Sequence, residues 1–213
     1  MKIITPTFEF LKPVDGMAML RSIENAARTC YKSEDKITDD SCLKLVKSLI
    51  AHGHHAMLEH ESVSARVICD RGVSHELVRH RIASFAQEST RYCNYNTDKF
   101  DKQITVIKPV FYKEGTREYS TWKIGCEEAE QVYLALLALG STAQEARSVL
   151  PNSLKTEIVI TMNLRSWRHF FELRACGTTG KPHPQMLEIA VPMLNEFKML
   201  IPIVFDDLIS MEV

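Results

Sequence analysis

Residues 79–92 of this 213-residue chain read RHRIASFAQESTRY. The stretch holds three arginines, a histidine and several hydroxyl or amide side chains among few apolar residues, although the net charge of the whole chain is only −1. Arginine presents a planar fork of donors that matches phosphate oxygens two at a time, so three in one stretch favour a nucleotide or polyphosphate ligand. The alternative is that Arg79 and Arg81 form ordinary ion pairs with Glu76 and Glu88 on a solvated helix face.

The composition is that of an ordinary globular protein, with 45% hydrophobic and 25% charged residues. No linker-like, low-complexity or repeated segment interrupts the chain, so we expect one domain over residues 1–213. The first residues lack the layout of a secretory signal and no apolar run approaches the roughly 18 residues of a membrane span, so we expect a cytoplasmic protein. The balanced charge argues against non-specific nucleic-acid binding, and any anion site must be local.

Six cysteines are scattered along the chain without a C-x-x-C pair. This spacing indicates reduced thiols rather than a disulfide framework or a thiolate zinc site. We interpret Cys93 and Cys176, which lie near the motif residues, as small packing residues. The others are Cys30, Cys42, Cys69 and Cys126.

Residues 52–60 read HGHHAMLEH and contain four of the eight histidines. Imidazole is a common zinc ligand, so a metal-dependent hydrolase is one alternative function. The spacing is poor for it, because a helical zinc pair places two histidines four apart with a glutamate directly after the first. We therefore expect no metal site. The hydrolase would use His54, His55, Glu59 and His60.

Hydrophobic periodicity alternates between strand and helix spacing, which predicts a mixed α+β fold. We expect Asp15, Ser74 and Ser166 to cap helices, and residues 70–72 to form a turn. The strands are expected near residues 2–11, 61–68, 102–110 and 156–164, and the helices near residues 15–31, 38–51, 75–79, 118–139, 142–150, 167–175 and 185–201.

A second alternative is an RNA-binding module, because arginines and aromatic residues interleave on the helix expected at residues 167–175. We favour a core role for the aromatic residues, since aromatics on one amphipathic helix usually pack inward. The RNA-binding module would use Arg79, Arg81, Arg165 and Arg168.

The order Arg79-His80-Arg81, seven residues and then Ser89 resembles the signature of the flavin-dependent thymidylate synthase family. Three further blocks resemble the same family, so the resemblance covers essentially the whole chain. They are the histidine segment 53–60, residues 147–151, and the run Asn163-Leu164-Arg165 with His169 and Leu173-Arg174-Ala175.

The resemblance implies a single α+β domain of this family's type that assembles as a homotetramer with shared active sites. It implies a flavoprotein methyltransferase of nucleotide biosynthesis, specifically of thymidylate synthesis. The enzyme would transfer a one-carbon unit from the folate 5,10-methylenetetrahydrofolate to carbon 5 of dUMP, with FAD reduced by NADPH as the hydride source. Unlike the folate-only class of this activity, the flavin class needs no protein thiol to attack the pyrimidine.

The same resemblance implies roles for individual residues. Arg174 would be catalytic, and the dUMP phosphate would be bound by Ser89, Arg91, Arg147 and the backbone N–H groups of residues 87–90. We prefer Ser89 as a phosphate ligand rather than a nucleophile, because no base stands at a fixed spacing. The cofactor-binding set is His54, Ala56, Arg79, His80, Arg81, Gln87, Asn163, Arg165 and His169. The substrate-binding set is Glu76, Arg79, Gln87, Glu88, Ser89, Thr90, Arg91, Arg147 and Arg174.

The chain departs from the family's fuller pattern at three places. Ala86-Gln87 stands where Asn-Glu is frequent, and His169 stands where asparagine is frequent. Gln87 can hydrogen-bond a ribose or pyrimidine but cannot act as a base. The loop at residues 177–184 is long, which leaves the role of His183 open.

Overall fold

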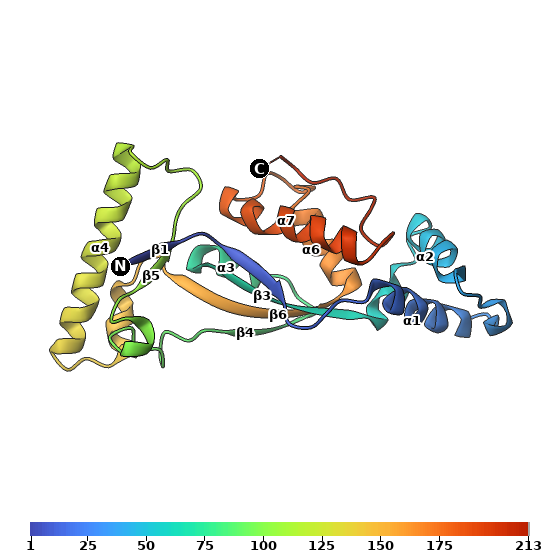
Figure 1. Ribbon diagram of the computed structural model, residues 1–213, viewed down its shortest axis with the longest axis horizontal. Coiled ribbons are helices and arrows are strands. Elements are labelled where there is room, and N and C mark those ends of the chain that lie inside the picture. The colour runs from blue at the N-terminus through green and yellow to red at the C-terminus, as the bar shows by residue number, and fades with distance from the viewer. Residues whose placement is uncertain (213) are drawn as a thin grey trace. The chain divides into compact units, whose positions relative to one another are not determined.

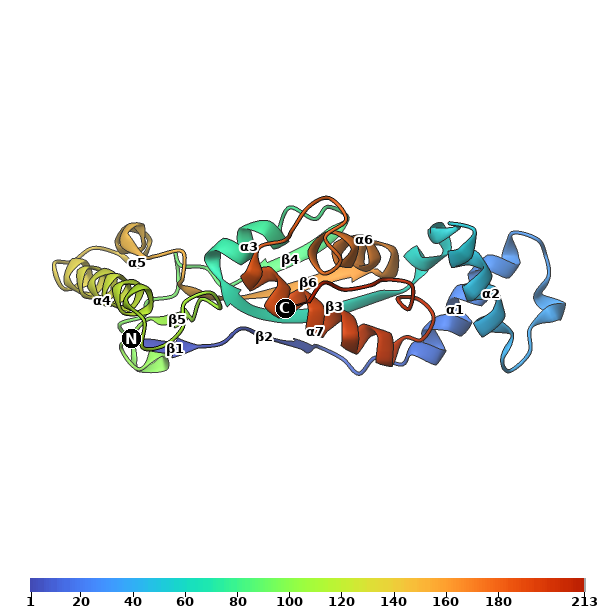
Figure 2. The same ribbon diagram turned by 90° about the horizontal axis from the view of Figure 1, so that it is seen from above.

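The computed structural model describes residues 1–212 and has a mixed α+β fold (Figures 1 and 2), which confirms the predicted class. Its strands are β1 (Lys2–Ile4), β2 (Thr7–Phe10), β3 (Ser62–Asp70), β4 (Ala83–Gln87), β5 (Thr105–Ile107) and β6 (Lys155–Asn163). Its α-helices are α1 (Gly16–Thr29), α2 (Ser41–Ala51), α3 (Arg71–Leu77), α4 (Arg117–Ala138), α5 (Ala143–Ala146), α6 (Leu164–Arg174) and α7 (Pro184–Leu200). Short 3-10 helices are η1 (Glu34–Lys36), η2 (His55–His60), η3 (Asp98–Phe100) and η4 (Arg147–Val149).

The chain folds into two compact units. Unit 1 comprises Met1–Thr7, Val67–Arg79 and Ala86–Val159, and unit 2 comprises Phe8–Arg66, His80–Phe85 and the chain from Ile160 onward. A four-stranded sheet has the order β2-β3-β6-β4, and a two-stranded sheet pairs β1 with β5. The expectation of one domain over residues 1–213 stays a prediction. None of the described helices combines the length and apolarity needed to cross a membrane.

Unit 1 is built around the parallel pair β1–β5, in which Ile3 lies opposite Val106. Its buried core joins Ile104 and Val106 to Cys126 and Tyr133 of α4. Helix α4 is capped by the Thr116 side chain and lies against α5 (Figure 2). The chain turns after α4 at Gly140, whose φ of 96° favours glycine.

Cys126, Val132, Tyr133 and Leu139 recur at helical spacing in the sequence, which predicts one apolar stripe for this helix. This prediction is partly wrong. Cys126 and Tyr133 are buried, but Val132 is 48% and Leu139 is 84% exposed. The buried Glu130 stands on this helix and accepts the backbone N–H of Ile104 at 2.9 Å. The helix therefore presents apolar side chains to solvent within unit 1.

Helices α6 and α7 of unit 2 lie side by side (Figure 1), and both contribute to an aromatic core. Trp167 is fully buried, stacks on Phe171 at 5.8 Å and lies 5.1 Å from Phe197. Its indole N–H donates to the carbonyl of Val63 at 3.0 Å, which satisfies the one polar group of the ring. The interpretation of these aromatics as core residues is confirmed.

Helices α1 and α2 form the other part of unit 2. The Asp15 side chain accepts the Ala18 N–H at 2.9 Å, which confirms the predicted cap. Buried Glu24 accepts from Arg28 at 2.8 Å and from the Ser41 hydroxyl at 2.8 Å, and this links the two helices. The apolar spacing of the sequence extends this helix to Tyr31. That prediction is wrong, because Tyr31 lies beyond the end of α1 and is 85% exposed.

Two local expectations in unit 1 are also wrong. Asp70 is not part of a turn but the cap of α3, because its side chain accepts the Val73 N–H at 2.8 Å. Ser74 is therefore inside the helix and donates to the Arg71 carbonyl instead of capping. Strand β4 was not expected within the arginine-rich stretch.

All six cysteines are free thiols. Cys42, Cys69 and Cys126 are buried, and burial raises the pKa of the Cys69 and Cys126 thiols.

His183 caps α7 by accepting the Gln185 N–H at 3.3 Å, which gives this loop histidine a structural role that the sequence left open.

Candidate active site

The predicted site residues divide between the two units. Most of the predicted cofactor set lies in unit 2 together with Arg174, and most of the predicted substrate set lies in unit 1. Unit 2 holds His54, Ala56, His80, Arg81, Asn163, Arg165, His169 and Arg174. Unit 1 holds Glu76, Arg79, Gln87, Glu88, Ser89, Thr90, Arg91 and Arg147.

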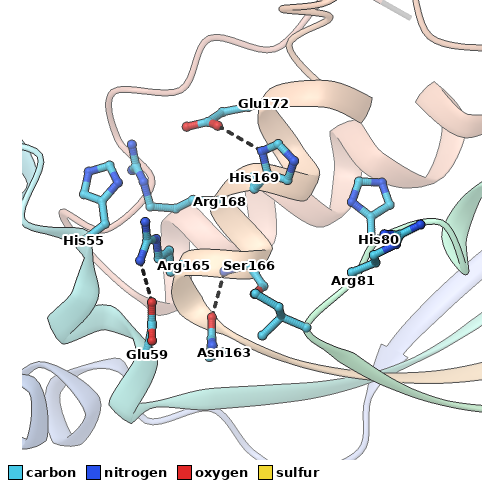
Figure 3. Close-up of a pocket in the computed structure, with 11 residues that line it drawn as sticks. His55, Glu59, His80, Arg81, Asn163, Arg165, Ser166, Arg168, His169 and Glu172 are labelled. Atoms are coloured by element: carbon cyan, nitrogen blue, oxygen red, sulfur yellow. Dashed lines mark hydrogen bonds and ion pairs between the residues drawn. The ribbon is translucent and has the colours of Figure 1, made fainter.

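Unit 2 contains a cavity of about 450 Å³ (Figure 3). Its walls come from the loop that starts at His80, from α6 and from η2, which are segments far apart in the sequence. Five of the lining side chains are arginine or histidine from the two predicted motif blocks, and such donors suit a phosphorylated ligand. They are His80, Arg81, Arg165, Arg168 and His169.

Helix α6 begins one turn earlier than predicted. The side chain of Asn163 accepts the Ser166 N–H at 2.8 Å, so Asn163 is the cap and the assignment of Ser166 is wrong. Arg165 and His169 stand four residues apart and therefore share one face of the helix. Both are exposed at the cavity, and Arg165 pairs with Glu59 at 2.6 Å (Figure 3).

Arg168 is the buried arginine of this cavity, with 3% of the residue exposed. Its guanidinium forms two parallel bonds of 2.7 Å to the Asp207 carboxylate and a further bond to the Val204 carbonyl. The pairing with Arg168 lowers the pKa of the Asp207 carboxyl. Arg168 therefore fastens α6 to the segment after α7, and it does not form the exposed basic surface that an RNA-binding module needs.

His80 and Arg174 form a direct pair in unit 2. The Arg174 Nε–H donates to Nε2 of His80 at 3.1 Å. The His80 ring is 7% exposed and packs edge-on against Phe170 at 5.0 Å. Burial, and then the positive charge of Arg174 and the neighbouring His169, lowers the pKa of His80 to about 4. The imidazole is thus neutral at neutral pH.

Arg81 and Ile82 form the exposed edge of the cavity. Ile82 has φ of 61° and is 79% exposed. A β-branched residue in the left-handed region is strained, and such strain is concentrated at functional sites. Both side chains line the cavity, so the strained backbone presents an apolar surface beside a guanidinium.

Gln87, the departure from the family's glutamate, has a fixed orientation in unit 1. Its amide nitrogen lies 2.9 Å from the Ser74 hydroxyl and 3.2 Å from the Thr156 hydroxyl. The Ser74 O–H already donates to the Arg71 carbonyl at 2.9 Å, so the Ser74 oxygen can only accept from Gln87. The Gln87 amide oxygen is left as an acceptor for a ligand.

Glu88 is turned into the protein rather than toward a ligand. Its carboxylate accepts from Lys155 at 2.9 Å and from the Tyr95 hydroxyl at 2.9 Å. Its backbone N–H donates to the Glu157 carbonyl at 2.8 Å. The expectation that every N–H from Gln87 to Thr90 faces a phosphate is therefore wrong for Glu88, although the repulsive carboxylate is neutralised.

The turn after Glu88 has the features of an anion site. Within residues 1–212, the structure records no acceptor for the consecutive backbone N–H groups of Ser89 and Thr90. Arg147 donates to the Thr90 hydroxyl at 3.2 Å, and Arg91 donates to the Gln144 side chain at 3.4 Å. Two guanidinium groups and two adjacent amides thus gather at one turn of unit 1.

The remaining predicted residues lie nearby in sequence but make fewer contacts. Arg79 is exposed directly after α3, and its backbone N–H donates to the Glu76 carbonyl at 3.3 Å. His54 and Ala56 are exposed at the start of η2. Among the described residues, no group of three or more His, Cys, Asp or Glu side chains is arranged to hold a metal ion.

Sequence reasoning missed several residues that support these sites. Lys155 holds Glu88, Glu59 holds Arg165, and Asp207 holds Arg168. Each partner is separated from the residue it holds by at least 39 positions in the chain. No local pattern signals such a pair.

A cavity and a turn that are rich in guanidinium groups, on a mixed α+β fold, are typical of a protein that binds phosphorylated ligands. The chain belongs to the family described as thymidylate synthase complementing protein, whose model matches residues 14–203. The resemblance seen in the sequence is thereby confirmed.

Similar proteins agree with this family. The flavin-dependent thymidylate synthase of Pyrococcus abyssi is 34% identical over 184 residues, which cover 83% of this chain and 73% of the relative. That of Geobacter sulfurreducens is 33% identical over 189 residues, which cover 85% of this chain and 78% of the relative. The crystal structure of a UMP/dUMP methylase, PolB from Streptomyces cacaoi, bound with 5-Br dUMP, has a TM-score of 0.78 at 23% identity. The likeness covers 97% of this chain and 96% of that one and shows a shared fold.

Proposed function

We propose that this protein is a flavin-dependent thymidylate synthase. It would methylate dUMP to dTMP with 5,10-methylenetetrahydrofolate as the carbon donor and FAD, reduced by NADPH, as the hydride source. The observation that carries the proposal is the meeting of His80 and Arg81 of the signature with Asn163, Arg165 and His169 at one cavity of unit 2. The curated relatives bear the name of this activity.

The residues of the unit 2 cavity fit a flavin cofactor. Arg81 and Arg165 are exposed at the cavity and can pair with a pyrophosphate, and Ile82 offers an apolar surface for a flat ring. The Asn163 side-chain oxygen is occupied by the cap, so its NH₂ group is the part that can donate to a ligand. When bound, FAD would supply the redox chemistry.

The turn in unit 1 fits the phosphate of dUMP. The amides of Ser89 and Thr90 and the guanidinium groups of Arg91 and Arg147 would hold the phosphate oxygens. Glu88 would stay neutralised by Lys155. Ser89 serves better as a ligand than as a nucleophile, because its oxygen accepts the Arg91 N–H at 3.3 Å and no base contacts it among the described residues.

Arg174 would act on the pyrimidine. A guanidinium beside the uracil carbonyl and N3 stabilises the negative charge that develops there, and so raises electron density at carbon 5. The role of the chain in this step is to hold that cation in place. NADPH and the folate would bind as co-substrates.

The protein would work in the cytoplasm as a homotetramer with shared active sites. Apolar side chains on the exposed face of α4 support an assembly, since Ile124 is 53% and Val132 is 48% exposed. Light scattering should give a mass four times that of one chain, and a monomeric mass would contradict the assembly.

The visible spectrum of the purified protein is the sharpest test of the whole proposal. The protein, as isolated or after incubation with FAD, should be yellow and should lose its colour when NADPH is added without oxygen. Addition of dUMP and 5,10-methylenetetrahydrofolate should restore the oxidised spectrum and yield dTMP. A protein that neither binds FAD nor forms dTMP would refute the proposal.

Arg147→Ala should weaken dUMP binding without affecting the flavin. The substitution removes a cation that contacts Thr90, and loss of one charge-assisted contact should raise the KM for dUMP about 10- to 100-fold. Initial rates at varied dUMP concentration measure it. Arg117→Ala, which removes an exposed arginine from α4 of the same unit, is the matched control. Equal KM values in the two variants would contradict the phosphate role.

A further inference from the structure

In the hydrogen bond between Arg174 and His80, Arg174 is the donor and His80 is the acceptor. Arg174 carries one hydrogen on Nε, and this hydrogen points at Nε2 of His80 over 3.1 Å. Nε2 must therefore hold a lone pair, so the ring is neutral with its proton on Nδ1. The bond fixes the plane of the Arg174 guanidinium, because this planar group rotates about the Cδ–Nε bond and Nε carries the donated hydrogen.

The surroundings of His80 hold the ring in place. It is 7% exposed, lies edge-on to Phe170 at 5.0 Å and is 6.2 Å from the ring of His169. Phe170 is itself buried in the core of unit 2. The acceptor is therefore anchored to the same helix, α6, that carries Arg174.

We infer that His80 is a positioning residue for Arg174, in which neutral Nε2 orients the guanidinium for catalysis. This inference rests on the proposed function, because it takes Arg174 as the group that acts on the substrate. It assigns to His80 a task separate from the contact with the cofactor that the sequence motif implies.

Acid should break the arrangement. Arg174 and His169 of α6 act on His80, and both disfavour an imidazolium. Arg81 and the Glu172 carboxylate line the same cavity, and Glu172 lies 3.7 Å from His169. Burial, then Arg174 and His169, lowers the pKa of His80 from 6.5 to about 4, so the folded protein binds fewer protons than the unfolded chain between these values. The stability that neutral His80 contributes is complete above pH 6.5 and is lost as the pH falls toward 4.

Four variants test the inference: His80→Leu, His80→Gln, Arg174→Ala and the double variant His80→Leu/Arg174→Ala. Leucine removes the acceptor, so turnover per bound FAD should fall about 10- to 30-fold, whereas the glutamine oxygen should restore it to within about threefold of wild type. If His80 acts through Arg174, the double variant should be no slower than Arg174→Ala alone. His75→Leu, at an exposed position of α3, is the matched control.

Two results would overturn the inference. One is a His80→Leu variant that loses FAD but turns over normally in its FAD-loaded fraction, which would leave only the cofactor contact. The other is a double variant in which the two losses multiply, because the residues would then act independently.

A measurement without substrate separates this inference from the proposed function. In the folded protein, the NMR signal of the Arg174 Nε–H should move when pH falls through about 4, with the protonation of His80, and should shift in His80→Leu. An Arg174 signal that is unchanged by both would refute the pairing even in an active enzyme. Absence of dTMP formation by wild type would refute the proposed function and leave the pairing to be judged by NMR.

Discussion

Arg174→Ala is expected to keep FAD bound and to lower turnover by about 100- to 1,000-fold, the range for removing one preorganised donor to a developing negative charge. Arg174 stands at the end of α6, and its neighbour His80 holds its Nε–H. The flavin spectrum of the variant reports cofactor binding, and single-turnover formation of dTMP reports chemistry.

Arg174→Lys is the matched control for this variant. Lysine keeps the charge but lacks the planar fork and the Nε–H that His80 accepts, so it should recover little of the lost rate. Wild-type turnover in FAD-loaded Arg174→Ala would show that the guanidinium takes no part in the reaction.

Trp167→Ala should lower the free energy of unfolding by about 3–5 kcal/mol, as expected for removal of a large buried aromatic ring. Trp167 is fully buried among Phe170, Phe171 and Phe197, and its loss also leaves the Val63 carbonyl without its donor. Urea unfolding followed by circular dichroism gives the value. Because α6 also carries Arg165, the affinity for FAD should fall together with the free energy of unfolding.

Trp122→Ala provides the comparison, since Trp122 is the other of the two tryptophans and is only half-buried. Its indole N–H donates to the Ser153 hydroxyl at 2.9 Å, so some stability should be lost, but less than at Trp167. Similar losses at both positions would mean that the aromatic cluster of unit 2 does not dominate the core.

Periodicity predicted the elements whose own sequence carries an apolar face. Helix α1 buries Leu20, Ile23 and Ala27 at helical spacing, and β6 buries Ile158 and Ile160 at alternate positions. Strand β4 was missed because its sequence, ASFAQ, has no strong alternation, and its place in the sheet depends on pairing with the distant β6. Pairing between segments so far apart leaves no local signal.

Both cap errors have one cause. Asp70 and Asn163 each end a strand and begin the next helix, whereas Ser74 and Ser166 were expected to do so. Either residue type can cap, and what decides is that the strand ends without a connecting turn. The backbone of the last strand residue is already extended, as a cap requires.

The candidate site was predictable in its charges but not in its supports. The arginine and histidine residues at motif spacing indicated that the protein binds phosphorylated molecules. Helix α6 does bring Arg165 and His169 to one cavity. The acids that hold these cations come from remote segments, as Asp207 does for Arg168. Only the folded structure shows which arginine forms a structural ion pair and which can contact a ligand.

At Ile82, selection for stability and selection for activity should favour different residues. A left-handed isoleucine costs roughly 1–2 kcal/mol, so a library screened for heat resistance should enrich glycine or asparagine at position 82. Growth of a host that cannot make thymidine by another route should instead retain isoleucine, because its side chain walls the cavity. Deep sequencing of the two populations would show opposite enrichment at this codon.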